Sequence, residues 1–212
     1  MNYLYLHGFA SAPQSRKAQN LRDRFGQSGH TLHIPDLNQG NFTGLSLSRQ
    51  IQQVQTEYLA TGEPTTVIGS SFGGLTAAWL GEKSPCVERV ILLAPAFQFL
   101  TNWKPKIPAD QWQRWESSGR MDIYHYGEQR MLPLDYGFVT DMMQYADGTL
   151  KRSLPTLIIH GLNDDVVPIR VSREYATDRS HVRLLEVNSD HSLGDQLERI
   201  WAETVNFCGL PL

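Results

Sequence analysis

Residues 67–77, VIGSSFGGLTA, place two adjacent hydroxyl groups among glycines directly after an apolar run. A phosphate loop of the Walker type needs a lysine after its last glycine, and none follows here. A dinucleotide fingerprint needs G-x-G-x-x-G, a spacing that Gly69, Gly73 and Gly74 do not give. The pattern G-x-S-x-G fits residues 69–73 directly, so the stretch predicts a nucleophilic serine on a sharp turn between a strand and a helix.

Steric grounds decide which serine occupies that turn. The residues two before and two after the nucleophile must lack a Cβ atom, because strand and helix approach closely there. Ser71 has Gly69 and Gly73 at these positions, whereas Ser70 would have Ile68 and Phe72. Ser71 is therefore the candidate nucleophile. The motif alone also fits a serine in an ordinary turn, so more distant residues must decide its meaning.

A serine hydroxyl is a weak nucleophile without an adjacent base, and the base needs an acid to fix its tautomer. In one known arrangement the acid and then the base follow the serine, each on a loop after a strand. HGLNDDVVP places Asp164 and Asp165 after the apolar run 155–160, and NSDHSL places His191 after the run 182–187. Of the seven histidines only His191 has the position of the base; His160, at the end of a strand, is assigned a structural hydrogen-bonding role.

The negative oxygen of a tetrahedral intermediate needs two backbone N–H donors near the nucleophile. We expect one to be the N–H of Phe72, the residue after Ser71. The segment YLHGFASAP supplies the other from a loop after an early strand, where Gly8 allows a close approach and the N–H of Phe9 is the expected donor. Gly8 also fits a plain strand-exit turn, and the two roles are compatible.

The elements that must position these residues alternate along the chain. Short aliphatic runs typical of buried parallel strands alternate with helical patterns over 13–29, 45–60, 74–83, 169–179 and 195–207. The apolar runs are 3–6, 31–34, 65–69, 89–94, 155–160 and 182–187. The alternation predicts an α/β fold, a three-layer α/β/α sandwich with a mostly parallel six-stranded sheet, in one domain over residues 1–212.

One interval breaks this alternation. About sixty residues separate the strand that ends near Ala94 from the one that starts near Pro155, which is too long for a simple crossover. The segment is rich in Trp, Tyr and Met, and its charges are mixed. We expect a helical insertion over 97–150 that packs its own aromatic side chains and also forms a cap over the site at the carboxyl edge of the sheet, because long ordered insertions in compact domains are usually functional.

Composition excludes several classes of function. The 212 residues carry a net charge of −3, so no basic excess favours nucleic-acid binding. The distant Cys86 and Cys208 fit no metal or redox spacing and are expected to be free thiols in a reducing cytosol. The N-terminus does not have the pattern of a signal peptide, and no window resembles a membrane span. We expect a cytoplasmic protein without metal or cofactor; the sequence does not give its oligomeric state.

Together YLHGF, GSSFGG, HGLNDDVVP and the late DHS resemble the α/β-hydrolase superfamily. More narrowly, YLHGFASAPQSRKA is similar to the opening of the small bacterial YqiA-like esterases, in which the first strands of the superfamily are absent. The resemblance runs from residue 3 to about 207, apart from the insertion. It implies the six-stranded sheet, a Ser–His–Asp triad and ester hydrolysis without a cofactor, and it selects Asp164 as the acid, with Asp165 solvated. The residues before His191 are Asn-Ser-Asp, where the superfamily often has glycine.

The sequence therefore predicts a serine hydrolase that cleaves a carboxylic ester or thioester of small-molecule type. Ser71 would be the nucleophile, His191 the base and Asp164 the acid, with an apolar pocket supplied by aromatic residues of the insertion and by Phe97 and Phe99. A peptidase or a C–C bond hydrolase could use the same triad. From a different class, a non-catalytic binding module could keep the same fold.

Overall fold

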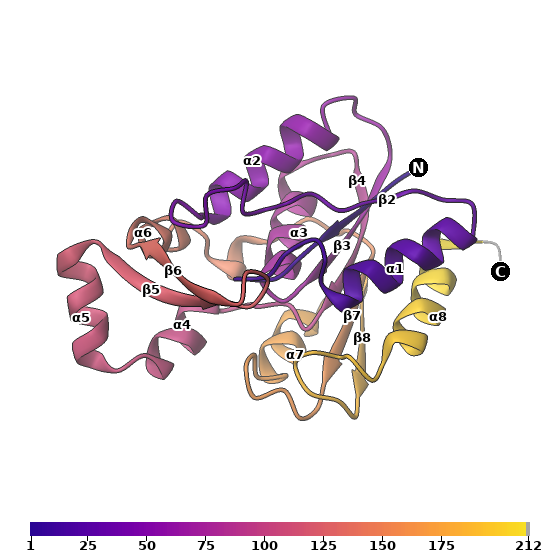
Figure 1. Cartoon of the computed structure of the whole chain (residues 1–212). Coiled ribbons are helices and arrows are strands. Elements are labelled where there is room, and N and C mark those ends of the chain that lie inside the picture. Colours follow the sequence, from indigo (N-terminus) through magenta and orange to yellow (C-terminus); the bar gives the residue numbers. More distant parts are fainter. Residues whose placement is uncertain (211–212) are drawn as a thin grey trace.

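The computed structural model describes residues 1–210, and its centre is a parallel sheet between two layers of helices (Figure 1). The strands are β1 (Asn2–Leu6), β2 (Leu32–His33), β3 (Thr65–Ser70), β4 (Val87–Leu93), β7 (Thr156–Gly161) and β8 (Val182–Val187). Their order is β2-β1-β3-β4-β7-β8, and every neighbouring pair is parallel. The predicted three-layer fold is confirmed; β2 is shorter than the apolar run that predicted it.

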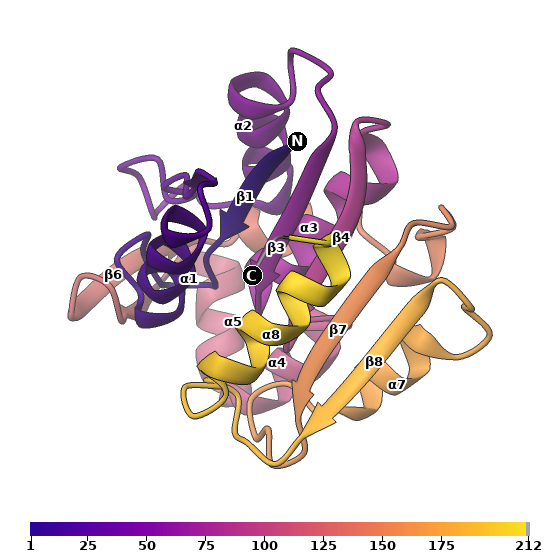
Figure 2. The ribbon, with the colours of Figure 1, turned by 90° about the vertical axis from the view of Figure 1, so that its right-hand side faces the viewer.

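Helices cover both faces of the sheet. The helices beside the sheet are α1 (Arg16–Gln27), α2 (Leu47–Tyr58), α3 (Phe72–Lys83), α7 (Arg170–Ala176) and α8 (Leu197–Cys208). Alternate residues of β1 point to opposite faces, so that Tyr3 and Tyr5 pack with α1 and α8, while Leu4 and Leu6 pack with α2, α3 and α7. Figure 2 looks onto the face that α1 and α8 cover. The two apolar cores hold the strand ends, and hence the candidate site, in fixed relative positions.

Residues between β4 and β7 form the insertion. It contains α4 (Phe99–Trp103), η1 (Lys104–Lys106), α5 (Ala109–Ser118), β5 (Arg120–His125), β6 (Arg130–Asp135), α6 (Gly137–Met142) and η2 (Asp147–Thr149). In Figure 1 most of it extends beyond α2 and α3, on the side away from α1 and α8. The antiparallel hairpin β5–β6 is an addition to the helices that the sequence led us to expect.

The hairpin has one buried and one exposed face. Met121 and its register partner Leu134 are buried, whereas Tyr124 and its partner Met131 are about half exposed. This alternation with period two is the signal in the sequence that could have predicted the hairpin. Among the helices of residues 1–210, none has the length and apolar character needed to cross a membrane.

Candidate active site

Ser71 occupies a sharp turn between β3 and α3. Its φ of 54° lies in the left-handed region, which costs a non-glycine residue conformational energy. Backbone hydrogen bonds hold it there: the N–H of Ser71 donates to the carbonyl of Leu93 (2.8 Å), and the N–H of Ala96 donates to the carbonyl of Ser71 (3.0 Å). The end of β4 therefore fixes the turn from the side.

Two glycines make this turn possible. A Cβ atom on Gly69 would overlap the backbone of Gly73, where strand and helix meet. A Cβ atom on Gly73 would overlap the carbonyl groups of Leu6 and His7 at the end of β1. The close approach on which the choice of Ser71 rested is therefore present, and it involves the neighbouring strand as well as the helix.

The two adjacent serines lie in different surroundings. Ser70 is the last residue of β3, is buried, and lies near the phenol of the fully buried Tyr5. Ser71 is partly exposed, and its Oγ lies 3.0 Å from Nε2 of His191. Only Ser71 therefore pairs with an imidazole.

His191 and Asp164 complete the hydrogen-bonded series. Nδ1 of His191 lies 2.7 Å from Oδ2 of Asp164, so Nδ1–H donates to the carboxylate and Nε2 is left to accept the Ser71 hydroxyl proton. The Asp164 side chain is fully buried, whereas that of His191 is 21% exposed. Asp165 is exposed, as expected for a solvated neighbour. The structure thus brings the predicted serine, histidine and aspartate together.

The Asp164 carboxylate is held ionised. Burial raises the pKa of this carboxyl, but hydrogen bonds from His160 and His191 outweigh burial and hold its pKa well below the usual range. Backbone N–H groups of Val166 (2.9 Å) and Val167 (2.7 Å) donate to Oδ1. The carboxylate therefore stays charged at neutral pH and can stabilise a positive charge on His191.

The loop that carries His191 is ordered without glycine before the histidine. Asp190 Oδ1 accepts hydrogen bonds from the N–H (2.8 Å) and the hydroxyl (2.6 Å) of Ser192, and the hydroxyl of Ser189 donates to Asp195. A glycine lies instead at the end of the neighbouring strand β7, where a Cβ atom on Gly161 would overlap the carbonyl groups of Ser189 and Asp190. Although the residues before His191 are Asn-Ser-Asp and not glycines, its ring still contacts both Ser71 and Asp164.

The loop after β1 brings Gly8, the residue before the expected oxyanion donor Phe9, close to Ser71. A Cβ atom on Gly8 would lie 3.9 Å from the Oγ of Ser71. His7 Nδ1 lies 3.0 Å from the Gly8 carbonyl oxygen, and His7 Nε2 accepts from the N–H of Leu37 (3.0 Å). Because a trans peptide directs its carbonyl and N–H to opposite sides, the bond to Gly8 fixes the direction of the Phe9 N–H. Phe72 begins α3, where N–H groups have no partner within the helix.

Aromatic side chains of the insertion pack around these donors. The Phe9 ring lies 5.4 Å from the rings of Trp103 and Phe138 and 5.8 Å from that of Phe99, measured between centroids. Phe97 has a different position, because it is buried and stacks at 4.2 Å on Tyr175 of α7. Phe99 therefore belongs to the aromatic cluster beside the site, and Phe97 does not.

The insertion is attached to two loops of the site. The N–H of Tyr126 in the hairpin donates to the carbonyl of Ala10, which follows Phe9 (2.8 Å). The ammonium of Lys106 donates to the carbonyls of Asp165 (2.6 Å) and Val166 (2.9 Å), beside the acid. The segment thus connects the loop after β1 to the loop after β7.

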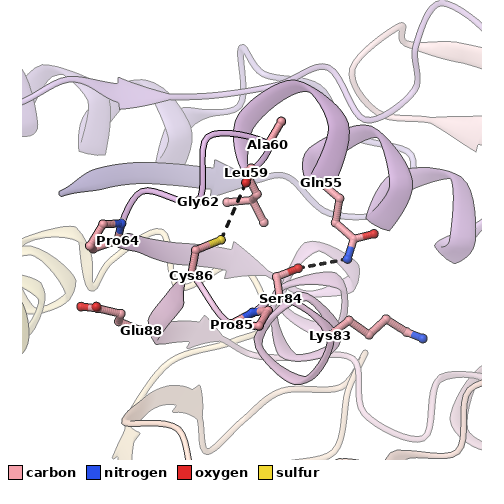
Figure 3. Close-up of a pocket in the computed structure, with 10 residues that line it drawn as sticks. All are labelled: Gln55, Leu59, Ala60, Gly62, Pro64, Lys83, Ser84, Pro85, Cys86 and Glu88. Atoms are coloured by element: carbon pink, nitrogen blue, oxygen red, sulfur yellow. Dashed lines mark hydrogen bonds between the residues drawn. The ribbon is translucent and has the colours of Figure 1, made fainter.

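Two cavities lie apart from Ser71. One of about 620 Å³ lies at the amino edge of the sheet, where Pro64 precedes β3 and Cys86 precedes β4 (Figure 3). The other, of about 380 Å³, lies between the loops after β1 and β2 and the hairpin, with Asp36 and His125 in its wall. No residue of the candidate triad lines either one. The larger cavity is at the opposite edge of the sheet from the hydrogen-bonded groups, so we do not assign the chemistry to it.

Sequence reasoning missed Lys17 near the candidate triad, and it assigned His160 a hydrogen-bonding role without naming the partner. The ammonium of Lys17 in α1 donates to the carbonyl of Ser192, next to His191 (2.6 Å), and burial lowers the pKa of this ammonium to about 8. No signal in the sequence links α1 to that loop. His160 contacts Asp164, four residues further on, and the spacing in HGLND is the signal that could have suggested it.

Parallel strands in the order β2-β1-β3-β4-β7-β8, with the serine turn after β3, are the fold of the α/β hydrolases. Alpha/beta hydrolase domain-containing protein 10 from mouse has this fold, with a TM-score of 0.81 at 18% identity over 98% of this chain and 89% of that one. The chain belongs to the uncharacterised protein family UPF0227, whose model matches residues 2–208. The resemblance to the YqiA-like proteins is thereby confirmed at the level of the family.

Two further proteins are similar to this chain. A Mycoplasma genitalium protein named "Putative esterase/lipase 2" is 26% identical over 163 residues. The match spans 66% of this chain and 61% of that protein, which is less than two thirds of the relative's length. Est1E from Butyrivibrio proteoclasticus, in a structure with ferulic acid bound, has a TM-score of 0.77 at 16% identity over 97% of this chain and 88% of that one. At such identities the structural likeness concerns the fold alone.

Proposed function

We propose that the protein is a serine hydrolase that cleaves a carboxylic ester or thioester through an acyl-enzyme on Ser71. The observation that carries the proposal is the series of two hydrogen bonds from Ser71 Oγ to His191 Nε2 (3.0 Å) and from His191 Nδ1 to Asp164 Oδ2 (2.7 Å). The esterase/lipase name of the Mycoplasma relative supports the choice of an ester bond.

In the first step, Ser71 Oγ attacks the acyl carbonyl while His191 Nε2 takes the hydroxyl proton. The tetrahedral oxygen accepts hydrogen bonds from the N–H groups of Phe9 and Phe72. Collapse of the intermediate breaks the bond to the alcohol or thiol, which leaves with the proton from His191. Throughout, the Asp164 carboxylate stabilises the positively charged imidazole.

In the second step, water attacks the acyl group on Ser71. His191 takes a proton from this water and returns it to Ser71 Oγ, so that the carboxylic acid leaves and the free enzyme is restored. The reaction consumes one ester and one water and needs no cofactor.

The insertion over 97–150 acts as a cap in this proposal. Its attachments at Ala10 and at Asp165 and Val166 support a position above the site. Its aromatic cluster around Phe9 is the apolar surface against which the acyl group or the alcohol packs.

Hydrolysis of p-nitrophenyl acetate and butyrate tests the proposal. We expect Ser71→Ala to lower kcat/KM by about 10⁴-fold or more, since the nucleophile is lost. Ser70→Ala, the matched control, removes only a buried hydroxyl and should retain most of the activity. Equal loss in both variants, or turnover by Ser71→Ala at the wild-type rate, contradicts the assignment.

A further inference from the structure

A second imidazole binds the carboxylate of the candidate acid. His160, near the end of β7, is fully buried. Its Nε2 lies 3.0 Å from Oδ2 of Asp164 and 2.9 Å from the carbonyl oxygen of Val167. Its Nδ1 lies 2.7 Å from Oγ of Ser172, a buried residue of α7. These three contacts account for both nitrogens of this ring.

These partners define where the proton of His160 lies. A carbonyl oxygen can only accept, so the nitrogen that faces Val167 carries hydrogen, and Nε2–H is shared between Val167 and Asp164. In the neutral ring Nδ1 then accepts the hydroxyl proton of Ser172. The hydroxyl thus favours the tautomer that donates to the acid.

The fully buried Asp164 side chain consequently receives four hydrogen bonds. Oδ1 accepts from the N–H groups of Val166 and Val167, and Oδ2 accepts from the two imidazoles, His160 and His191. A buried carboxylate needs such donors because burial without them disfavours its charge. Since both imidazoles share Oδ2, a change in His160 alters the bond to His191.

We propose that His160, fixed by Ser172, is a positioning residue that directs the Asp164 carboxylate toward His191 and shares its negative charge. The chain of contacts then extends from Ser71 through His191, Asp164 and His160 to Ser172. The effect of His160 on ester hydrolysis rests on the proposed function. The hydrogen bonds at Asp164 can be tested in the resting protein, without any substrate.

Other charged groups surround the two imidazoles and stay unchanged in the variants below. Glu186 of β8 is the register partner of His160 and forms a double hydrogen bond with Arg173, 2.7 Å at each oxygen. Other charged groups near the acid and the base include Lys17, Lys106, Asp165, Asp190 and Asp195. Because these groups are common to all the variants, a difference between variants reports on His160.

The pH dependence of kcat/KM for p-nitrophenyl acetate tests the positioning role. In His160→Leu, Oδ2 loses one donor, its charge is concentrated on the bond to His191, and a proton on that ring is held more tightly. We expect the acid limb of the profile to move to higher pH by about 0.5–1 unit, the size expected for the loss of one hydrogen bond of ordinary net strength. We also expect kcat to fall about tenfold while KM stays within about twofold.

Three further variants separate positioning from simple loss of packing. His160→Gln can still place an amide N–H near Oδ2 and should restore the limb to within about 0.3 unit of the wild type. Ser172→Ala removes the partner of Nδ1 and should give a smaller shift in the same direction. Thr204→Val removes a buried hydroxyl of α8 that bonds only within its own helix, and it should leave the profile unchanged.

A measurement on the resting protein is independent of the proposed function. The low-field NMR resonance of the proton between His191 and Asp164 should move further downfield in His160→Leu, and less so in Ser172→Ala. If the wild type cleaves no ester, the proposed function fails, and this resonance still decides the role of His160. The positioning role is overturned if the acid limb and the NMR resonance of His160→Leu both stay at the wild-type positions. If His160→Leu does not fold, the same result in Ser172→Ala overturns it.

Discussion

The hydroxyl of Ser71 and the imidazole Nε2 of His191 lie 3.0 Å apart although 120 positions separate them in the chain. Ser71 follows β3, and His191 follows β8 at the edge of the sheet. Asp164 follows β7, between them, and reaches His191 from the other side. Because parallel strands end at the same edge of the sheet, one edge collects three groups that the chain keeps far apart.

The two neighbouring aspartates should differ in their effect on activity. Asp164→Asn keeps the shape of the side chain but removes the charge and favours the wrong tautomer of His191, so we expect kcat to fall by about 10⁴-fold. Asp165→Asn changes an exposed residue and should leave kcat within about twofold. Steady-state kinetics with p-nitrophenyl butyrate measures both. A larger loss of kcat in Asp165→Asn than in Asp164→Asn would show that Asp164 is not the acid.

Stability at low pH should reflect the Asp164 carboxylate. Hydrogen bonds hold its folded-state pKa below the usual range, whereas in the unfolded chain the pKa is about 3.9. Above that value the stabilisation is fully present. As the pH falls below about 4 the unfolded chain takes up the proton first, and the stabilisation is lost progressively toward the folded-state pKa.

Urea unfolding at a series of pH values measures this effect. Between pH 4 and 2 the free energy of unfolding of the wild type should fall more steeply than that of Asp164→Asn, by up to about 1.4 kcal/mol per pH unit. Above pH 5 the difference between the two proteins should be constant. Parallel curves over the whole range contradict a depressed pKa at Asp164.

The turn at Ser71 should not accept a methyl group at Gly73. Gly73→Ala would drive a Cβ atom into the carbonyl groups of Leu6 and His7, so we expect the free energy of unfolding to fall by about 3 kcal/mol or more. Gly148→Ala is the matched control, because its Cβ atom would meet open space. Chemical denaturation of both proteins gives the comparison. Similar stability of the two variants would mean that β1 and α3 are not in close contact.

The aromatic cluster around Phe9 should limit the acyl chain. Trp103→Ala removes a ring 5.4 Å from that of Phe9 and opens space beside the candidate oxyanion donors. We expect the ratio of kcat/KM for p-nitrophenyl hexanoate to that for acetate to rise about tenfold. Trp201→Ala, on α8 at the other face of the sheet, should leave this ratio unchanged. An unchanged ratio in Trp103→Ala argues that the acyl group binds elsewhere.

The order of the strands and helices, and the three residues that meet at the sheet edge, follow from local patterns. Gly69 and Gly73 frame Ser71 within five positions, and Asp164 and His191 each come directly after an apolar run. Such signals are readable because the residues concerned are neighbours in sequence. The contact between Lys17 and the carbonyl of Ser192 joins residues 175 positions apart, and nothing near either one indicates it.

The insertion was the least predictable part of the fold. Its helices are short, and its hairpin has a proline at position 133 inside β6, which weakens the strand signal. Aromatic side chains of this segment pack against Phe9 and Phe72, and those contacts are absent from any short window of sequence. The sequence predicts a hydrogen-bonding role for His160, but it does not reveal that the partners are Asp164 and Ser172.

Labelling by a fluorophosphonate probe tests most directly whether Ser71 is an activated nucleophile. The probe reacts covalently with a serine hydroxyl that an adjacent imidazole activates. Mass spectrometry of the digested protein should find the adduct on Ser71, with labelling retained in Ser70→Ala and lost in Ser71→Ala. No adduct on the wild type, or an adduct on Ser70 that persists in Ser71→Ala, would contradict the central claim.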